Sequence, residues 1–236
     1  MELKNDKKTI RAWAMFDWSN SAYNLVITST IFPAYYTIIT TTEEHGDKVT
    51  FFGKQFVNTA LSNYALATAY LVMALLLPIL SSTADYRGNK KIFMKLFTYL
   101  GAIACGLLFF FRLETLELGI ICFTLAAIGY IGGVLFNNSY LPEIATVDQQ
   151  DRVSAQGFAY GYVGSVLLQI ICFVFVLQPG WFGITDGSFP ARLSFLLVAV
   201  WWIVFAQIPF RKLPKGSPNY DRIRSSRVSS GFDELR

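Results

Sequence analysis

Long apolar stretches alternate with short polar connections along most of the chain. A bilayer core about 30 Å thick requires roughly 20 residues of helix, because backbone polar groups there must form their hydrogen bonds within the segment. Six stretches are long enough, and they span residues 18–39, 57–80, 92–111, 118–141, 154–177 and 193–210. The pattern therefore predicts an all-α polytopic membrane protein with six transmembrane helices.

Composition supports this class of protein. Hydrophobic residues make up 53% of the chain and charged residues only 15%, whereas about 25% charged residues is typical of soluble proteins. Cys105, Cys122 and Cys172 lie in apolar stretches without CxxC spacing, so we expect neither a disulfide framework nor a structural zinc site.

Lys and Arg are distributed unevenly between the two sides of the predicted membrane domain. The N-terminal arm, the second and fourth connections and the C-terminal tail carry 16 of them, and the other side carries four. Since cytoplasmic connections carry the basic excess, we expect a multi-pass protein of the cell membrane with both termini in the cytoplasm. This asymmetry explains the net charge of +4 without a nucleic-acid partner.

The chain divides into three parts by composition. Residues 1–17 form a cytoplasmic arm, residues 18–210 form the six-helix bundle, and residues 211–236 form a linker rich in Pro and Ser. The last residues resemble the first turn of a new amphipathic segment. We therefore expect the linker to lead to a second half that this sequence lacks.

A polar stripe enters the first predicted helix. Asp17, Asn20, Ser21, Asn24 and Thr28 share one helical face, with Tyr23 beside them. Polar side chains in a membrane helix usually face the bundle interior or a water-filled path, so we expect this stripe to line a substrate pathway. Two alternatives remain open: Asp17 caps the helix, or Asn20 and Asn24 form hydrogen bonds between helices.

Two further patterns lie on the fourth and fifth predicted helices. Tyr130, Gly133 and Asn137 share a face of the fourth, with Asn138 adjacent, and they either join the pathway or form polar contacts between helices. Gly157, Gly161 and Gly164 share a face of the fifth, where small residues allow close approach of a neighbouring helix. Ordinary helix packing is the better interpretation of these glycines.

Catalytic chemistry finds little support. The single histidine, His45, lies in an acidic loop with Glu43, Glu44 and Asp47, which is more typical of a solvated loop than of a metal site. No nucleophile and base are spaced for catalysis. We expect no enzyme activity, no metal and no cofactor.

The connection over residues 81–91 has a distinctive arrangement of charges. Asp85, Arg87, Gly88, Lys90 and Lys91 follow one another within it. It resembles the signature loop of the major facilitator superfamily, G-x-x-x-D-[RK]-x-G-x-[RK]-[RK], with Ser81 in place of the first glycine and Tyr86 in place of the first basic residue.

Two other stretches resemble the vacuole effluxer-like branch of that superfamily, which includes autophagy-linked amino-acid effluxers. They are AWAMFDWSNSAYN at residues 12–24, and LPEIA at 141–145 followed by RVSAQGFAYGYVGS at 152–165. The resemblance implies the N-terminal half of a twelve-helix transporter, built as a 3+3 repeat. It further implies that the first and fourth helices line the cavity, that Asp85 acts in a cytoplasmic gate, and that the fifth helix with its glycines faces the other half.

Together these patterns predict a secondary active transporter that moves a small polar solute, with amino acids as the candidate class, by alternating access. Its partners would be the lipid bilayer, the solute and a second six-helix half. The alternatives are a non-transporting membrane scaffold and a membrane-embedded enzyme.

Overall fold

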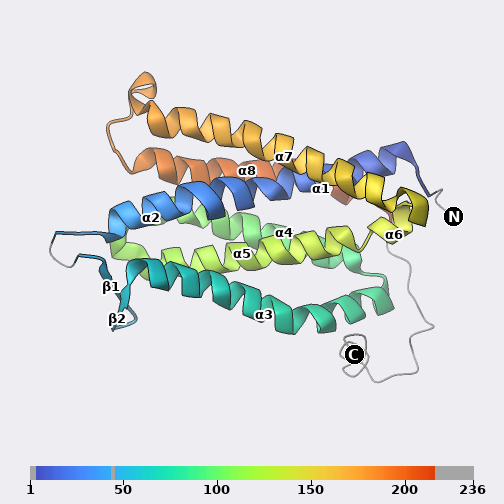
Figure 1. Cartoon of the computed structure of the whole chain (residues 1–236), viewed down its shortest axis with the longest axis horizontal. Helices are drawn as coiled ribbons and strands as arrows, with labels where there is room; N and C mark the ends of the chain where they lie inside the picture. Colours follow the sequence, from blue (N-terminus) through green and yellow to red (C-terminus); the bar gives the residue numbers. More distant parts are fainter. Residues whose placement is uncertain (1–3, 44–45, 216–236) are drawn as a thin grey trace.

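A computed structural model describes residues 4–43 and 46–215 of the chain. Long helices lie side by side along one direction and form an elongated bundle (Figure 1). Within the described residues, five helical segments are long and apolar enough to cross a membrane: Asn58–Ala84, Lys90–Phe110, Leu113–Ile144, Val147–Leu177 and Phe189–Lys212. The predicted class, an all-α polytopic membrane protein, is confirmed.

Each long helix extends beyond its predicted apolar stretch at one end or at both. The long ones are α3 (Asn58–Arg87), α4 (Lys90–Leu107), α5 (Leu116–Asn138), α7 (Val147–Leu177) and α8 (Phe189–Lys212). The short ones are α6 (Leu141–Ile144), η2 (Leu108–Phe110), η3 (Leu113–Thr115) and η4 (Pro179–Phe182). Hydropathy marks only the apolar part of a helix, whereas helical hydrogen bonding continues into the polar residues at its ends.

The first predicted span is part of one continuous helical run over residues 7–40, made of α1 (Lys7–Ala22), η1 (Tyr23–Ile31) and α2 (Phe32–Thr40). It begins well before residue 18 because the side chain of Asp6 caps α1 by accepting a hydrogen bond from the Thr9 backbone N–H at 2.9 Å. Part of the predicted arm is therefore helical.

The middle segment, η1, is a π-helix. Pro33 is the second residue after it and has no N–H to donate to the preceding turn. Two hydroxyl groups bond to backbone carbonyls five residues earlier: Ser29 Oγ donates to Asn24 O at 2.9 Å and Thr30 Oγ1 donates to Leu25 O at 2.7 Å. A π-helical segment of this length is rare, and such segments are frequent at functional sites.

A β-hairpin, which the all-α prediction missed, connects α2 to α3. Strands β1 (Lys48–Phe51) and β2 (Lys54–Val57) pair antiparallel around a two-residue turn. Phe52 and Gly53 both adopt positive φ, at 45° and 77°, as a type I′ turn requires. The available signal was the polar–apolar alternation of Lys48–Phe51 directly before a glycine-containing pair.

The packing of the helices follows a regular order. Helix α1 packs on α7 and α8, α5 packs on α3 and α4, and α4 packs on α8.

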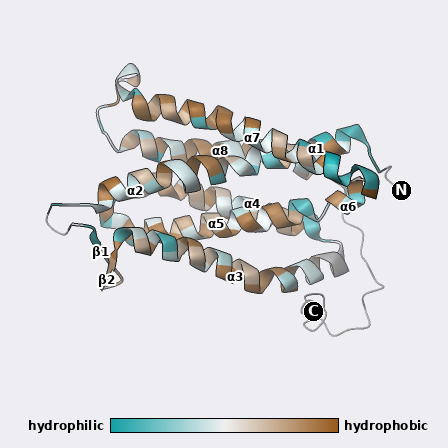
Figure 2. Ribbon diagram, viewed as in Figure 1, coloured by the Kyte–Doolittle hydropathy of each residue, from teal (hydrophilic) through white to brown (hydrophobic). Residues whose placement is uncertain are grey.

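Apolar residues cover the lengths of the helices, and polar residues are concentrated toward the bundle ends (Figure 2). We call the end of the bundle that carries α6 the α6 end. There, Asn5 N donates a hydrogen bond to Ile144 O at 2.8 Å, and Lys91 Nζ donates one to Leu213 O. The other, the hairpin end, carries β1, β2 and η4 (Figure 1).

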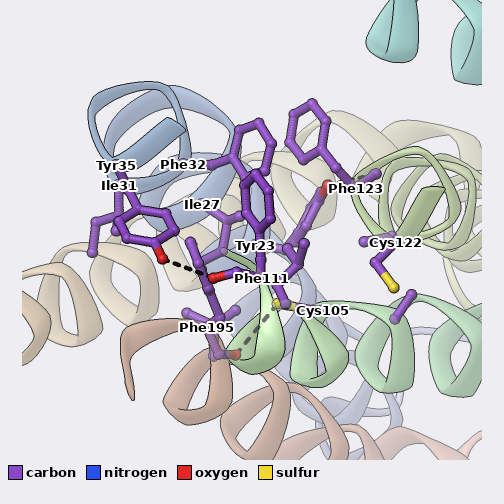
Figure 3. Packing of buried hydrophobic residues seen from close by; sticks show 14 of the residues in the cluster. Tyr23, Ile27, Ile31, Phe32, Tyr35, Cys105, Phe111, Cys122, Phe123 and Phe195 are labelled. Atoms are coloured by element: carbon purple, nitrogen blue, oxygen red, sulfur yellow. Dashed lines mark hydrogen bonds between the residues drawn. The ribbon is translucent and has the colours of Figure 1, made fainter. Parts of the chain in front are cut away.

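Aromatic side chains pack together in a buried cluster (Figure 3), which also includes Val49 of β1. Phe32 on α2 stacks on Phe123 on α5, with ring centroids 3.8 Å apart. Tyr35 OH donates to the Phe111 backbone oxygen at 2.7 Å, so this buried phenol is satisfied. The first contact holds α2 against α5, and the second joins α2 to the residue after η2.

Candidate functional site

Asp17 lies on α1 where this helix meets α5 and α7. Its Oδ1 accepts a hydrogen bond from Asn137 Nδ2 on α5 at 3.5 Å. One turn earlier, Trp13 Nε1 donates to the Asn137 backbone oxygen at 2.7 Å. Because Asp6 caps α1, the alternative that Asp17 caps a helix is wrong. Asp17 is instead a partly buried carboxyl group where α1 meets α5 and α7.

The glycine face of α7, defined here as Gly157, Gly161 and Gly164, packs directly on α1. A Cβ on Gly157 would stand 2.4 Å from Asp17 Oδ2, one on Gly161 would stand 2.7 Å from Ser21 Oγ, and one on Gly164 would stand 2.8 Å from the Trp18 ring. The implied orientation of these glycines toward another half is therefore wrong. They make room for the polar side of α1 within this chain.

Asn20 continues the polar face of α1 toward the bundle centre. Its side chain is fully buried, and neither Nδ2 nor Oδ1 has a hydrogen-bond partner. A Cβ on Gly133 would lie 3.3 Å from Asn20 Oδ1, so the absence of a side chain at Gly133 leaves space for this amide. Asn137 Oδ1 is also buried and unpartnered. Buried amides without partners are exceptional in folded proteins, so these atoms are candidates for binding a water, a solute or an ion.

The remaining predicted pathway residues fall into two sets. Tyr23 and Tyr130 face each other, with ring centroids 5.8 Å apart, and Thr28 Oγ1 is buried without a partner. Asn24 and Asn138 are exposed on the surface of this bundle. The structure thus brings Asp17 together with Asn137 and places Asn20 beside Gly133, one turn away on each helix, whereas Asn24 and Asn138 face outward.

The predicted gate loop is mostly helical. Helix α3 continues through Arg87, and only Gly88, with φ 65°, and Asn89 separate it from α4. Lys90 Nζ forms an ion pair with Glu143 Oε1 on α6 at 2.6 Å and donates to Ser139 O at 3.3 Å. Lys91 Nζ donates to the Leu213 backbone oxygen. The side chains of Asp85 and Arg87 lie outside the described residues.

Two charged groups with clear roles were missed from sequence. Glu143 is one of them, and its partner Lys90 lies far away in the chain, so the sequence does not indicate the pair. Arg192, only 4% exposed, pairs through Nη2 with Asp186 Oδ2 at 2.7 Å and lies 5.6 Å from the Phe109 ring centroid. Hydrogen bonds from Ser188 and the charge of Arg192 lower the pKa of Asp186.

Two cavities lie at the hairpin end. One of about 660 Å³ is lined by residues that include Thr42, Lys48 and Gln55, and one of about 210 Å³ lies between α2, α7 and α8. Over the described parts of the chain, no cluster of three or more His, Cys, Asp or Glu side chains forms a metal site. His45 and Glu44, from the acidic loop, fall outside the described residues.

Comparison with known proteins gives a consistent result. The pattern of the family described as vacuole effluxer Atg22 like matches residues 5–150 and 143–233. The chain is 33% identical to the uncharacterized MFS-type transporter YxiO of Bacillus subtilis over 89% of its own length and 47% of that protein. No solved structure matches the chain significantly.

Fungal proteins are similar at lower identity. Autophagy-related protein 22-2 of Aspergillus niger is 22% identical over 66% of the chain and 36% of the fungal protein. Autophagy-related protein 22 of Yarrowia lipolytica is 36% identical over a shorter segment, 30% of the chain and 12% of the fungal protein. The chain thus spans about half the length, or less, of the curated relatives it matches.

Proposed function

The chain belongs to the vacuole effluxer Atg22-like family of the major facilitator superfamily, and from this membership we propose that it moves a small polar solute, with amino acids as the first class to test, by alternating access. The observation that carries the proposal is the hydrogen bond between Asp17 and Asn137 at the junction of α1, α5 and α7, with the buried amide of Asn20 beside Gly133 one turn away. A polar cluster inside a membrane bundle is costly unless a solute, water or ion uses it.

The packing order supports a sixth span and a 3+3 repeat. We take the helical run over residues 7–40 as the first span, although its π-helical segment interrupts the α-helix. Helix α1 packs on α7 and α8, and α5 packs on α3 and α4. In a 3+3 repeat the first span corresponds to α5, α3 corresponds to α7, and α4 corresponds to α8. The contacts of α1 with α7 and α8 then correspond to those of α5 with α3 and α4, as a two-fold repeat requires.

Charge supports an orientation in the cell membrane. The α6 end carries the basic residues of the arm and of the turn between α3 and α4, including Lys90 and Lys91. The hairpin end carries Lys48, Lys54, Arg112 and Arg192. By the positive-inside rule, the α6 end faces the cytoplasm, together with both termini.

The exposed faces of α3 and α7 are the candidate surfaces for a second six-helix half, in the same chain or in another subunit. Exposed apolar side chains on them include Tyr70, Leu71, Tyr162 and Val166. The contacts of Lys90 with Glu143 and of Lys91 with Leu213 hold the α6 end together, which supports a role for this turn in a cytoplasmic gate.

Within this proposal, Asp17, Asn20, Tyr23, Asn24, Thr28, Tyr130, Asn137 and Asn138 line the pathway. Asn20 and Asn137 have unpartnered amide atoms that suit the amino and carboxylate groups of an amino acid. The exposed positions of Asn24 and Asn138 suit a cavity that the second half completes.

Transport by the complete protein in liposomes tests the proposal. Liposomes preloaded with a mixture of unlabelled amino acids should take up radiolabelled amino acids by exchange. Asn20→Ala should reduce this uptake at least about tenfold, since a lost hydrogen bond to a charged group is worth about 1.5–3 kcal/mol. Gln207→Ala is the matched control, because this amide on α8 bonds to Tyr99, outside the cluster. Equal uptake by both variants, or no uptake of any amino acid by the wild type, would contradict the proposal.

A further inference from the structure

We propose that Asp17 is the proton-binding residue of this transporter, and that the glycine face of α7 closes on it only while its carboxyl group is protonated. This inference rests on the proposed function, because a proton-binding site couples to transport only if transport occurs. It assigns a coupling ion and a coupling residue, neither of which follows from family membership.

The first step is the closeness of the fit around the carboxyl group. Oδ2 lies so near Gly157 that any side chain there would collide with it, and Trp13 encloses the same point, with its ring 2.7 Å from where that Cβ would stand. Oδ1 has a single hydrogen bond, the 3.5 Å contact from Asn137 Nδ2. The packed arrangement of α1 on α7 therefore leaves little room for water between Oδ2 and α7.

The second step is the absence of a compensating charge. The described ion pairs are Lys90 with Glu143 and Arg192 with Asp186, and no Lys or Arg among the described residues pairs with Asp17. The groups that face Asp17 are neutral: Asn137 on α5, Gly157 and Gly161 on α7, and Trp13 on its own helix. Tyr130 on α5 is a titratable group that interacts with it electrostatically, and this phenol is also neutral at physiological pH.

The third step is the vacant acceptor beside the carboxyl group. Asn137 Oδ1 is buried and lacks a donor. An ionised carboxylate has no donor to give, whereas a protonated one has an O–H. After rotation of the Asn137 amide, a protonated Asp17 donates to that oxygen, and Nδ2 moves to the place that the oxygen held. Protonation thus keeps a hydrogen bond between Asp17 and Asn137 and removes the unpaired charge from this junction.

The mechanism follows from these three steps. An unpaired ionised carboxylate is strongly disfavoured in a dry site. In the closed arrangement, the Asp17 O–H bond is intact. When α1 and α7 separate, water reaches the carboxyl group, the O–H bond breaks and the proton passes to water. Closing the glycine face again requires a proton from water, which ties the helix movement to proton binding.

A sodium ion is the competing coupling ion, and the site suits it poorly. Asp17 is the one carboxylate at this junction among the described residues, and no cluster of acidic groups accompanies it. The close fit of Gly157 against Oδ2 also leaves little room for a hydrated ion. Sodium dependence is therefore an outcome that would overturn the proposal.

The first test is the pH dependence of thermal unfolding of the complete purified protein. If Asp17 is protonated in the folded state and ionised in the unfolded chain, the folded state binds more protons and its stability falls as pH rises. Between about pH 5 and about pH 8, the Tm of the wild type should fall by at least about 2 °C more than that of Asp17→Asn. Asp148→Asn is the matched control, because Asp148 is exposed at the start of α7 and should keep the wild-type slope. Equal slopes for wild type and Asp17→Asn would overturn the proposal.

The second test uses the wild type and does not depend on a variant that folds. Dicyclohexylcarbodiimide reacts with protonated carboxyl groups in apolar surroundings. Peptide mass spectrometry at about pH 7 should find the adduct on Asp17 and not on the exposed Asp148 or Asp186, whose carboxyl groups are ionised at that pH. Labelling of Asp17 only at about pH 4, or no labelling of Asp17, would overturn the proposal.

Transport measurements separate this inference from the proposed function. In liposomes, an imposed pH gradient should drive solute accumulation by the wild type and not by Asp17→Asn, with a sodium gradient having no effect. If no solute moves but the two tests above give the expected results, the proposed function fails and the proton site stands. If solute moves without regard to the pH gradient, or with the sodium gradient, the proton site fails and transport stands.

Discussion

A Cβ atom on Gly157 would stand 2.4 Å from Oδ2 of Asp17, so the carboxyl group occupies the space that a side chain on α7 would need. This contact joins the fifth predicted span to the first. It explains why a helix of the membrane domain carries glycines, which are poor helix formers, on one face.

The first prediction concerns this contact. Gly157→Ala should lower the free energy of unfolding of the complete protein by about 1–3 kcal/mol, because the added methyl group collides with both Asp17 and the Trp13 ring. The measurement is chemical or thermal unfolding in detergent. Gly180→Ala is the control, since nothing lies within 4 Å of its Cβ position, and its effect should stay within about 0.5 kcal/mol. A similar effect for the two variants would contradict the packing described.

The second prediction concerns the crossing of α4 and α5. A Cβ on Gly129 would stand 2.3 Å from the Gly101 Cα. Backbone atoms cannot move aside as a side chain can, so Gly129→Ala should destabilise the protein by about 3 kcal/mol or more. The same unfolding measurement should rank Gly129→Ala as more harmful than Gly157→Ala. The reverse order would show that the α1–α7 contact is the more rigid one.

The third prediction concerns the ion pair between Lys90 and Glu143. Its side chains are 14% and 30% exposed, so solvent screens the pair only in part. Lys90→Gln and Glu143→Gln should each destabilise the α6 end, and a double-mutant cycle should give a coupling energy of about 1 kcal/mol. Lys48→Gln, a change of an exposed lysine at the hairpin end, is the control. Additive effects of the two single changes would mean that the pair contributes nothing.

The fourth prediction concerns pH at the hairpin end. The hydrogen bonds from Ser188 and the charge of Arg192 lower the pKa of Asp186, so the folded state favours its ionised form. The stability that Asp186 contributes is present above the ordinary aspartate pKa of about 3.9 and is lost as pH falls through its lower folded-state value. On acidification below about pH 4, the Tm of the wild type should therefore fall more than that of Asp186→Asn. Parallel loss in both proteins would exclude the contribution.

The sequence predicted the membrane class because a bilayer imposes a minimum length of apolar helix that shows directly in hydropathy. It also indicated the polar stripes of the first and fourth spans, since residues three or four apart share a helical face. Whether Asp17 would meet Asn137 was open, because periodicity within one helix does not tell which helix packs against it.

Other features depend on local geometry or distant partners and left weaker signals. The capping of α1 by Asp6 lies in a polar segment where hydropathy gives no information. The π-helical segment arises from the hydrogen bonding of Ser29 and Thr30 just before Pro33, which no period of 3.6 residues reveals. Lys90 and Glu143 lie in two different connections, far apart in the chain. Their spacing therefore does not predict that they form an ion pair.

The hairpin has a mechanical consequence. Asn58 Nδ2 donates to Thr40 Oγ1 at 3.0 Å and to Thr41 Oγ1 at 3.2 Å, and Asn58 N donates to Asp47 O at 2.8 Å, so the end of α2 and the start of α3 are fastened together. Farther along the bundle, the span that contains α1 and α2 and the span formed by α3 pack on different helices. Helix α1 packs on α7 and α8, and α3 packs on α5. The two spans are therefore joined at the hairpin end and separate toward the α6 end. A small change of the angle at the junction would displace them most at the α6 end.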